Sequence, residues 1–385
     1  MREVAVLGIG QTKVEEQWDK SLRELAGDAA LAALQDAGVG RVDAVYTGNM
    51  MSGSANFQQH LGSYIADWIG MRFAEGLRLE AACSSGSAAF RTGVMAVASG
   101  AVDTALTVAV EKMTDSPANE ITAELATAAD AEWEGDQGLS FVALNALVMR
   151  RYMHEYGWQH ADFMPFTLNA HANGAHNPYA RFQKAISEKA YLNAPVVCDP
   201  INVMDASPMG DGAAAVLLVP AEALRRLPGA RVITVLASSG ATDTIAVHNR
   251  RHGPFLQAAY LSAQQAYRQA RLTPDDIDFF ELHDAFTIMA ALSLEASGFA
   301  ERGQAPRLAL DGEIRPTGRI PIATLGGLKA RGHPVGATGM YQIVEVIRQL
   351  RGEAGGAQID GARIGMAQNI GGSGSNILTH ILGCC

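Results

Sequence analysis

The sequence predicts an α/β protein built from two similar halves, and three observations support this prediction. Apolar strands and amphipathic helices alternate in the first 113 residues, which is typical of a mostly parallel sheet with helices on its faces. A similar order of elements returns later in the chain. A helical segment without strand alternation separates two strands of the first half. We therefore expect a first half of residues 1–113 and 196–222, an inserted loop domain of residues 114–195, and a second half of residues 223–385.

Composition narrows the class of protein before any motif is considered. The chain has 385 residues, of which 48% are hydrophobic and 40 are glycine, so it can form a large core. A net charge of −10 without a basic stripe argues against nucleic-acid binding. No apolar run reaches the roughly 20 residues that cross a bilayer. We expect a cytoplasmic protein with reduced thiols and no membrane insertion.

The first half contains the pattern of a helix-covered sheet. A helix at 21–38 begins at Ser21, a preferred N-cap residue, and ends at Gly38, which suits a left-handed C-cap. Further helices are expected near 57–69 and 85–99. Strands are expected at 4–10, 42–49, 77–80, 104–110 and 211–219.

The second half repeats this order. Strands are expected at 232–240 and 362–368, a strand that runs into a turn at 276–286, and a helix at 254–272. The segment "CSSGSA" from Cys83 aligns with "HPVGAT" from His333, and Gly86 then matches Gly336. Both segments precede a helix followed by a strand. If the duplication is real, Cys83 and His333 occupy equivalent turns that face one another across a pseudo-two-fold axis.

Cys83 can be interpreted in two ways from its surroundings. At the start of a helix, the helix dipole would lower the thiol pKa and favour a nucleophilic thiolate. A free cysteine among small residues is, however, more often a buried core residue. The other cysteines, Cys198, Cys384 and Cys385, have no CxxC spacing and no paired histidines. We assign them no role and expect no metal site.

Three further loops are candidates for chemistry. His333 lies in the glycine-dense "GGLKARGHPVGATG", where an imidazole would be held as an acid, base or oxyanion donor. His283 and Asp284 follow an apolar strand, a common place for α/β sites, although a turn with a cap explains them as well. The loop "NIGGSGSN" at 369–376 could supply backbone donors or form a hairpin turn.

Taken together, the chain resembles the thiolase superfamily over nearly its whole length. The resemblance implies a five-layered αβαβα fold from two duplicated halves, a dimer or dimer of dimers, and acyl-CoA substrates. Coenzyme A or acetyl-CoA would bind as a substrate, with no permanently bound cofactor. The stretches that carry the resemblance are "AACSSGSAA", "VEKMTD", "DASPMGDGAAAV", "ELHDAF", "GGLKARGHPVGATG" and "AQNIGGSGSN".

The resemblance also assigns roles to individual residues. Cys83 corresponds to the acylated nucleophile and His333 to the base that activates it. The backbone N–H groups of Cys83 and of Gly371–Gly372 would hold the oxyanion. The expected reaction is reversible Claisen condensation, or thiolytic cleavage of acetoacetyl-CoA or another 3-ketoacyl-CoA, through an acyl-cysteine.

Two departures from ordinary thiolases concern the second catalytic base. Ordinary thiolases have Asn-Glu-Ala-Phe where this chain has His283-Asp284-Ala285-Phe286, and a second cysteine where it has Asn369. His283 is then the candidate base for the α-proton. This pattern is similar to archaeal acetoacetyl-CoA thiolases and to sterol-carrier-protein-type thiolases, although the latter place a cysteine at Ala285. The archaeal branch often works with a small zinc-ribbon/OB-fold partner that helps to hold coenzyme A.

Two further expectations concern the phosphates of coenzyme A and alternative reactions. Arg181 and Lys184 are candidate donors for the phosphates of coenzyme A, although a solvated surface explains each of them too. One alternative is acyl transfer to another acceptor, or retro-aldol cleavage, which does not need Cys83. Another is a non-catalytic or partner-dependent subunit of a lipid or acyl-CoA complex.

Overall fold

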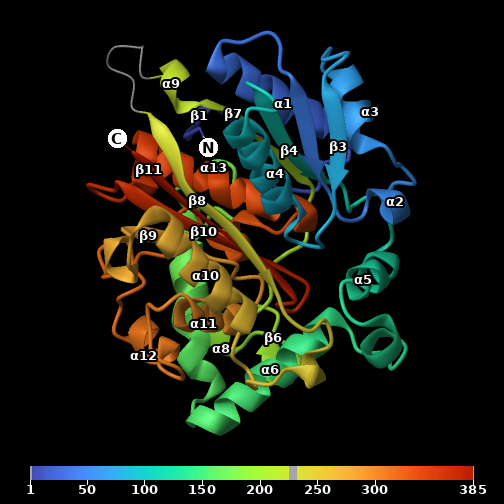
Figure 1. The fold of residues 1–385 in the computed structure, drawn as a ribbon. Helices are drawn as coiled ribbons and strands as arrows, with labels where there is room; N and C mark the ends of the chain where they lie inside the picture. The colour runs from blue at the N-terminus through green and yellow to red at the C-terminus, as the bar shows by residue number, and fades with distance from the viewer. Residues whose placement is uncertain (1, 225–231, 385) are drawn as a thin grey trace.

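A mixed β-sheet forms the centre of the protein (Figure 1). The structure, a computed structural model, describes residues 2–224 and 232–384. Within these residues nine strands form one hydrogen-bonded sheet in the order β3-β2-β4-β7-β1-β8-β11-β10-β9. The strands are β1 (Val4–Gln11), β2 (Ala44–Gly48), β3 (Glu75–Leu79), β4 (Ala105–Glu111), β7 (Gly212–Pro220), β8 (Ile233–Thr242), β9 (Phe279–Glu281), β10 (Ile364–Gly371) and β11 (Asn376–Cys384).

The strand order shows the internal duplication directly. The sequence β2-β4-β7-β1 in one part of the sheet matches β9-β10-β11-β8 in the other. In each set the first pair is parallel and the next two are antiparallel. The two parts meet where β1 and β8 pair through Ala5–Thr234 and Val6–Ile233. The counterpart of β3 is reduced to a single parallel bridge between Phe280 and Ile322.

The prediction of a mostly parallel sheet is wrong. Within the described chain, parallel pairing occurs between β2 and β3, β2 and β4, and β9 and β10, and the other pairs of this sheet are antiparallel. The reason is that each half ends with a returning strand. In the second half a short turn joins β10 to β11, and a turn of that length can only connect antiparallel strands.

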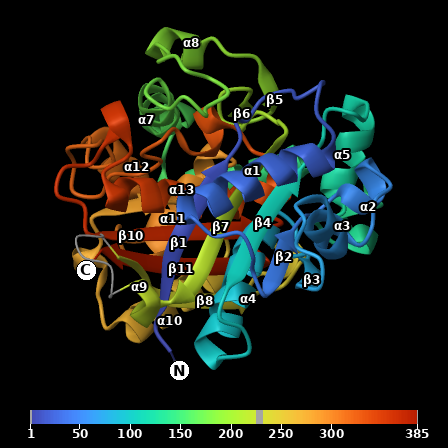
Figure 2. The same ribbon diagram turned by 90° about the horizontal axis from the view of Figure 1, so that it is seen from above.

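Helices and sheet together form five layers, as Figures 1 and 2 show. Helices α1 (Leu22–Ala37) and α3 (Leu61–Trp68) pack on the outer face of the first part of the sheet. Helices α4 (Ser85–Ser99) and α13 (Thr338–Arg351) contact one another and strands of both parts. Helix α10 (Gln257–Ala270) covers the outer face of the second part. The predicted αβαβα arrangement is therefore confirmed.

Local signals set the helix boundaries where the sequence placed them. Ser21 caps α1 in a capping box with Glu24, an arrangement that typically stabilises a helix by about 1 kcal/mol. Gly38 ends the helix with φ 67°. At the start of α4 and α13 the two backbones touch, because a Cβ on Gly86 would lie 3.0 Å from the carbonyl oxygen of Gly336. This contact brings the turns before the two helices together.

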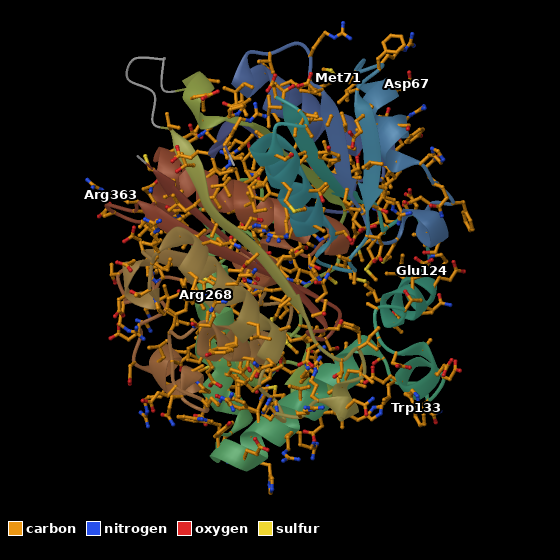
Figure 3. All side chains as sticks on the ribbon, viewed as in Figure 1. Asp67, Met71, Glu124, Trp133, Arg268 and Arg363 are labelled. Atoms are coloured by element: carbon orange, nitrogen blue, oxygen red, sulfur yellow. The ribbon has the colours of Figure 1, made fainter. Side chains whose placement is uncertain are left out.

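The segment between β4 and β7 is helical, as expected. It contains α5 (Ala118–Ala126), a π-helix (Ala131–Gly135), α6 (Phe141–Tyr156), α7 (Met164–Gly174) and α8 (Glu188–Leu192). A two-stranded sheet of β5 (Val196–Cys198) and β6 (Ile201–Asn202) follows. Figure 3 shows Glu124 and Trp133 of this segment at the edge of the molecule. The exact boundaries of the insertion and of the two halves stay a prediction.

Two strand predictions differ from the structure in length. In the segment expected at 276–286 as a strand that runs into a turn, the strand β9 is short, Phe279–Glu281, and His283 and Asp284 lie in the loop that follows it before α11 (Thr287–Ala296). In contrast, β10 continues through Gly371 into the predicted glycine loop. The remaining short helices are α2 (Ser52–Ala55), α9 (Ala221–Leu224) and α12 (Ala305–Leu310). No helix among the described residues is long and apolar enough to cross a membrane.

Candidate active site

The turn that carries Cys83 is held by its neighbouring serines. The Ser84 hydroxyl donates to the carbonyl oxygen of Ala81, and the Ser85 hydroxyl donates to that of Ala82, each at 2.6 Å. Ala82 has φ 50°, a left-handed conformation that is uncommon for a residue with a Cβ. Such conformations persist where surrounding contacts fix them, and they often occur at functional sites. The thiol position is thus set by the backbone of a tight turn.

Burial raises the pKa of the Cys83 thiol to about 12. The side chain is 4% exposed, and the nearby Glu111 carboxylate raises its pKa further. Hydrogen bonds from the backbone N–H groups of Cys83 and Gly372 act in the opposite direction. The prediction of a lowered pKa is therefore wrong, because burial outweighs the effect of the helix N-terminus. At neutral pH the sulfur carries a proton and needs a base.

His333 is held by hydrogen bonds from both its backbone and its ring. Its backbone N–H donates to the carbonyl oxygen of Pro208 at 3.0 Å. Its ring nitrogen Nδ1 lies 2.6 Å from Thr338 Oγ1. The Thr338 hydroxyl donates to the Pro334 carbonyl at 3.4 Å, so its oxygen is available to accept the Nδ1 proton. This arrangement leaves Nε2 as a free acceptor. Burial, with a smaller effect of the Arg331 charge, lowers the pKa of His333 to about 3, so the ring is neutral.

His283 has the opposite tautomer. Its ring centroid lies 5.2 Å from that of His333, with the two rings nearly perpendicular at 85°. Asn369 Nδ2 donates to His283 Nδ1 at 2.9 Å, so the ring proton is on Nε2. Burial, followed by the charges of His333 and Arg331, holds the pKa of His283 well below its usual value. In this state His283 is a hydrogen-bond donor.

The glycine loop reaches the same place from the end of β10. Gly371 is the last residue of β10, and a Cβ there would lie 2.5 Å from the carbonyl oxygen of Ala81. Gly372 has φ 60°, and a Cβ there would lie 2.7 Å from the Ala128 carbonyl oxygen. The available space therefore favours glycine at both positions, and at Gly372 the left-handed backbone favours it as well. The structure brings the predicted donors Gly371 and Gly372 next to Cys83.

Cys83 and His333 line one cavity of about 380 Å³, which we call the Cys83 cavity. Its other walls are mostly apolar. Cys198, for which the sequence suggested no role, also lines it, whereas Cys385 lies outside the described residues. The full lining is Cys83, Thr122, Leu125, Ala128, Ser140, Phe141, Val142, Val197, Cys198, Ala206, Ser207, Met209, Ala285, Phe286, His333 and Val335.

A second cavity of about 350 Å³ adjoins the first, and we call it the lysine cavity. The two share Ala206 and Ser207. Lys184, Lys329 and His171 contribute to the lining of the lysine cavity. Arg181, the other predicted phosphate donor, lines neither cavity. Its guanidinium instead pairs with Glu16 at 2.7 Å.

Asp205 is a positioning residue that sequence reasoning missed. Its carboxylate is fully buried and accepts hydrogen bonds from His160 Nε2 at 2.6 Å, Tyr191 Oη at 2.6 Å and Thr287 Oγ1 at 2.7 Å. Its carbonyl oxygen accepts from Lys329 Nζ. Asp205 therefore connects the helical insertion to the loops that carry His283 and His333. Its position in "DASPMGDGAAAV" was the available signal.

Glu111 connects the loop after β2 to the turn that follows His333. This buried carboxylate accepts from the N–H groups of Met50 and Met51 at 3.0 Å and from that of Gly336 at 2.9 Å. Burial raises its pKa to about 7.

Among the residues that the structure describes, no cluster of three or more histidine, cysteine or acidic side chains could hold a metal ion.

Comparisons with known proteins agree with this architecture. The family described as thiolase, N-terminal domain, matches residues 4–222, and thiolase C-terminal domain-like matches residues 239–384. The chain is 46% identical over 383 residues to an acetyl-CoA acetyltransferase of Methanothermobacter thermautotrophicus, covering 99% of each chain. It is 38% identical to one of Methanocaldococcus jannaschii, again covering 99% of each chain.

A solved structure, the Ltp2-ChsH2(DUF35) aldolase, superposes with a TM-score of 0.85 at 26% identity, covering 99% of this chain and 98% of that one. The fold and site thus define a thiolase-type acyltransferase. The chain belongs to the thiolase family.

Proposed function

We propose that the protein interconverts 3-ketoacyl-CoA and two shorter acyl-CoA thioesters through an acyl group on Cys83. The observation that supports this most strongly is the pairing of a protonated thiol with a neutral imidazole in one cavity. The similarity to relatives named acetyl-CoA acetyltransferase makes acetoacetyl-CoA the first substrate to test.

In the first step His333 Nε2 takes the proton of the Cys83 thiol, and the sulfur attacks the thioester carbonyl carbon. The backbone N–H groups of Cys83 and Gly372 donate to the resulting oxyanion. The carbon–sulfur bond to coenzyme A then breaks. His333 returns its proton to the leaving sulfur, so the ring is neutral again for the second step.

The tautomers change the role expected for His283 in the second step. Because Asn369 donates to His283 Nδ1, the ring presents Nε2–H and cannot accept a proton there. His283 then donates to the enolate oxygen, while His333 Nε2 takes the α-proton of the second acyl-CoA. The enolate carbon attacks the acyl-cysteine. The Cys83 sulfur leaves and recovers its proton from His333.

Coenzyme A would enter through the lysine cavity. Its phosphates need cationic partners in a protein of net charge −10. Lys184 is exposed at this cavity, and Lys329 and His171 line its wall. The shared residues Ala206 and Ser207 connect it to Cys83. Arg181, engaged with Glu16, is the weaker candidate of the predicted pair.

A second copy of the chain would pair at the β3 edge. Among the described strands β3 pairs only with β2, and Leu77 on β3 is 47% exposed with Phe73 nearby at 99%. Exposed apolar edges of this kind are typical interaction sites. Light scattering should show a dimer or dimer of dimers, and Leu77→Lys should shift it toward monomer. An unchanged mass for that variant would contradict this interface.

The rim of the two cavities is a candidate surface for a smaller acyl-CoA-binding partner. Val197 lines the Cys83 cavity and Val203 lines the lysine cavity, and each is about half exposed. The Ltp2-ChsH2(DUF35) aldolase shows that a similar chain occurs with a second component. Co-purification of a small protein that raises turnover would support a zinc-ribbon/OB-fold partner. Full turnover by the purified chain alone would contradict a requirement for it. The free thiols of Cys83 and Cys198 support a cytoplasmic location.

Replacement of Cys83 tests the proposed function. Cys83→Ala should abolish coenzyme A-dependent cleavage of acetoacetyl-CoA, since the acyl-enzyme cannot form. Cys384→Ala, far along the chain in β11, is the matched control and should retain the rate. Undiminished cleavage by Cys83→Ala would overturn the assignment. The retro-aldol alternative is not favoured, because it gives this thiol no role.

A further inference from the structure

Arg250 is a half-buried arginine beside the glycine loop that follows β10. Its Nη2 donates to the carbonyl oxygen of Ser373 at 2.5 Å. A Cβ on Gly374, which has φ 108°, would lie 3.4 Å from the same nitrogen and 3.6 Å from Nη1. The guanidinium therefore lies against the peptide unit between Ser373 and Gly374.

Two planar peptide units connect this guanidinium to the nucleophilic thiol. In the first unit, the Ser373 oxygen accepts from the guanidinium, and the Gly374 N–H donates to the Gly371 carbonyl oxygen at 3.3 Å. The second unit contains that Gly371 carbonyl together with the N–H of Gly372. The Gly372 N–H donates to the sulfur of Cys83 and is a proposed oxyanion donor. The guanidinium, both peptide units and the thiol thus form one continuous chain of hydrogen bonds.

A positive charge at one end of such a chain strengthens the donor at the other end. When a cation binds a carbonyl oxygen, it polarises the peptide group, and the N–H of that group becomes a better donor. Burial lowers the pKa of Arg250, whereas the charges of Asp243 and Glu134 raise it, and a guanidinium stays protonated at neutral pH. Arg250 therefore both orients the Gly372 N–H and increases its strength as a donor to a developing oxyanion.

The segment that carries Arg250 is itself fixed by hydrogen bonds. The Val247 N–H donates at 2.6 Å to Oε1 of Glu134, which is 2% exposed. The Arg250 N–H donates to the Val247 carbonyl oxygen at 3.2 Å. Nearby, the Asp243 N–H donates to the Ser375 carbonyl oxygen at 2.8 Å. This segment therefore joins the helical insertion to the glycine loop.

Stability alone does not account for the placement of this arginine. Among the described residues, its Nε and Nη1 have no hydrogen-bond partner, although both atoms are buried. Burying N–H groups of a cation without partners destabilises a folded protein. A catalytic site is one of the recognised reasons for such unsatisfied groups in a native structure.

We propose that Arg250 is a positioning residue for the oxyanion site and acts through the two peptide units that end at the Gly372 N–H. The inference rests on the proposed acyl transfer to Cys83. Without the guanidinium, the Gly372 N–H loses its fixed direction and part of its donor strength. Acylation of Cys83, which passes through an oxyanion, should then slow by about tenfold or more.

Two reactions of the same thiol separate positioning from general disruption of the site. Acetyl transfer from acetyl-CoA passes through a tetrahedral oxyanion. In alkylation by iodoacetamide the sulfur displaces iodide from a saturated carbon, and no oxyanion forms. Arg250→Met should therefore lower the ratio of the acetylation rate to the alkylation rate by about tenfold or more. Arg251→Met makes the same change at the exposed neighbouring residue, and as the matched control it should leave the ratio unchanged.

Intact-mass measurement of the full chain gives both rates. Because the Gly372 N–H also favours the thiolate, a small loss common to both reactions is expected in Arg250→Met, and the ratio removes it. A ratio equal to that of the parent, whether both rates fall together or neither does, overturns the role of Arg250 and leaves the proposed function intact. The absence of an acetyl adduct on the parent chain overturns the proposed function as well, so the two failures are distinguishable.

The carbonyl vibration of the acyl-enzyme provides a second measurement that does not depend on rates. With acetyl-CoA labelled at the carbonyl carbon, isotope-difference infrared spectra isolate the band of the acetyl group on Cys83. A weaker hydrogen bond to the carbonyl oxygen moves this band to higher frequency, so Arg250→Met should shift it upward and Arg251→Met should not.

If Arg250→Met does not fold, Arg250→Lys keeps the charge but loses the planar fork of the guanidinium. It should show a smaller upward shift of the band and a smaller drop in the rate ratio. A band and a ratio identical to those of the parent in every folded Arg250 variant would overturn the inference.

Discussion

The turns of Cys83 and His333 occupy equivalent places in the two halves but differ in chemistry. Each turn precedes a central helix, α4 or α13. The residue directly before Cys83 is Ala82, with φ 50°, and the residue directly before His333 is Gly332, with φ 107°, so both have a positive φ. The nearby charges have opposite signs. The Glu111 carboxylate affects Cys83, whereas the Arg331 guanidinium affects His333.

This difference keeps both groups uncharged. Burial raises the thiol pKa and lowers the imidazole pKa, and the neighbouring charge adds to the shift in each case. The resting site is therefore a neutral thiol and a neutral imidazole. The two duplicated turns thus carry dissimilar residues at matching positions, and under the proposed function these act as an acid and a base.

Removing the imidazole of His333 should have the largest effect on activity. His333→Ala is expected to lower kcat for acetoacetyl-CoA cleavage by about 10³ or more, because no other acceptor takes the thiol proton. His380→Gln is the matched control: this second buried histidine also has a pKa lowered to about 3, but lies on β11 beside Ser238. Equal losses in both variants would indicate a folding defect and not a missing base.

The next largest effect should come from His283. Loss of an oxyanion donor typically costs about 10² in rate, so His283→Ala should fall by that factor. His283→Asn restores an N–H donor but no base, and should recover most of the activity. If the asparagine variant is as slow as the alanine variant, His283 is a base and the tautomer argument is wrong.

The protonation state of the Cys83 thiol can be tested without any substitution. A thiol with a pKa near 12 forms more thiolate with each step of pH, so alkylation by iodoacetamide should rise about tenfold per pH unit from pH 7 to 10. Peptide mapping assigns the product to Cys83. A plateau in the rate below pH 9 would show that the thiol pKa is not raised.

The smallest effect is expected at Ala82. Ala82→Gly relieves the left-handed strain but adds freedom to the unfolded chain, so the free energy of unfolding should change by no more than about 1 kcal/mol. Urea unfolding measures it. A loss above about 2 kcal/mol would mean that the Ala82 methyl group, and not only its backbone, supports the turn.

Sequence reasoning reached the duplicated fold and the pair Cys83–His333 because local signals repeat. The Ser21 cap and the matching glycines 86 and 336 are examples of such signals. It missed the direction of the Cys83 pKa, because burial depends on segments far apart in the chain. For the same reason it could not foresee the hydrogen bond from Asn369 to His283, which joins residues 86 positions apart.

The acyl-enzyme itself tests the central claim most directly. The protein is mixed with isotopically labelled acetyl-CoA, quenched in acid and mapped by peptide mass spectrometry. The account predicts one acetyl adduct, on Cys83, that forms quickly in the parent chain, slowly in His333→Ala and not at all in Cys83→Ala. An adduct on Cys198 instead, or turnover of acetoacetyl-CoA without any adduct on Cys83, would contradict it.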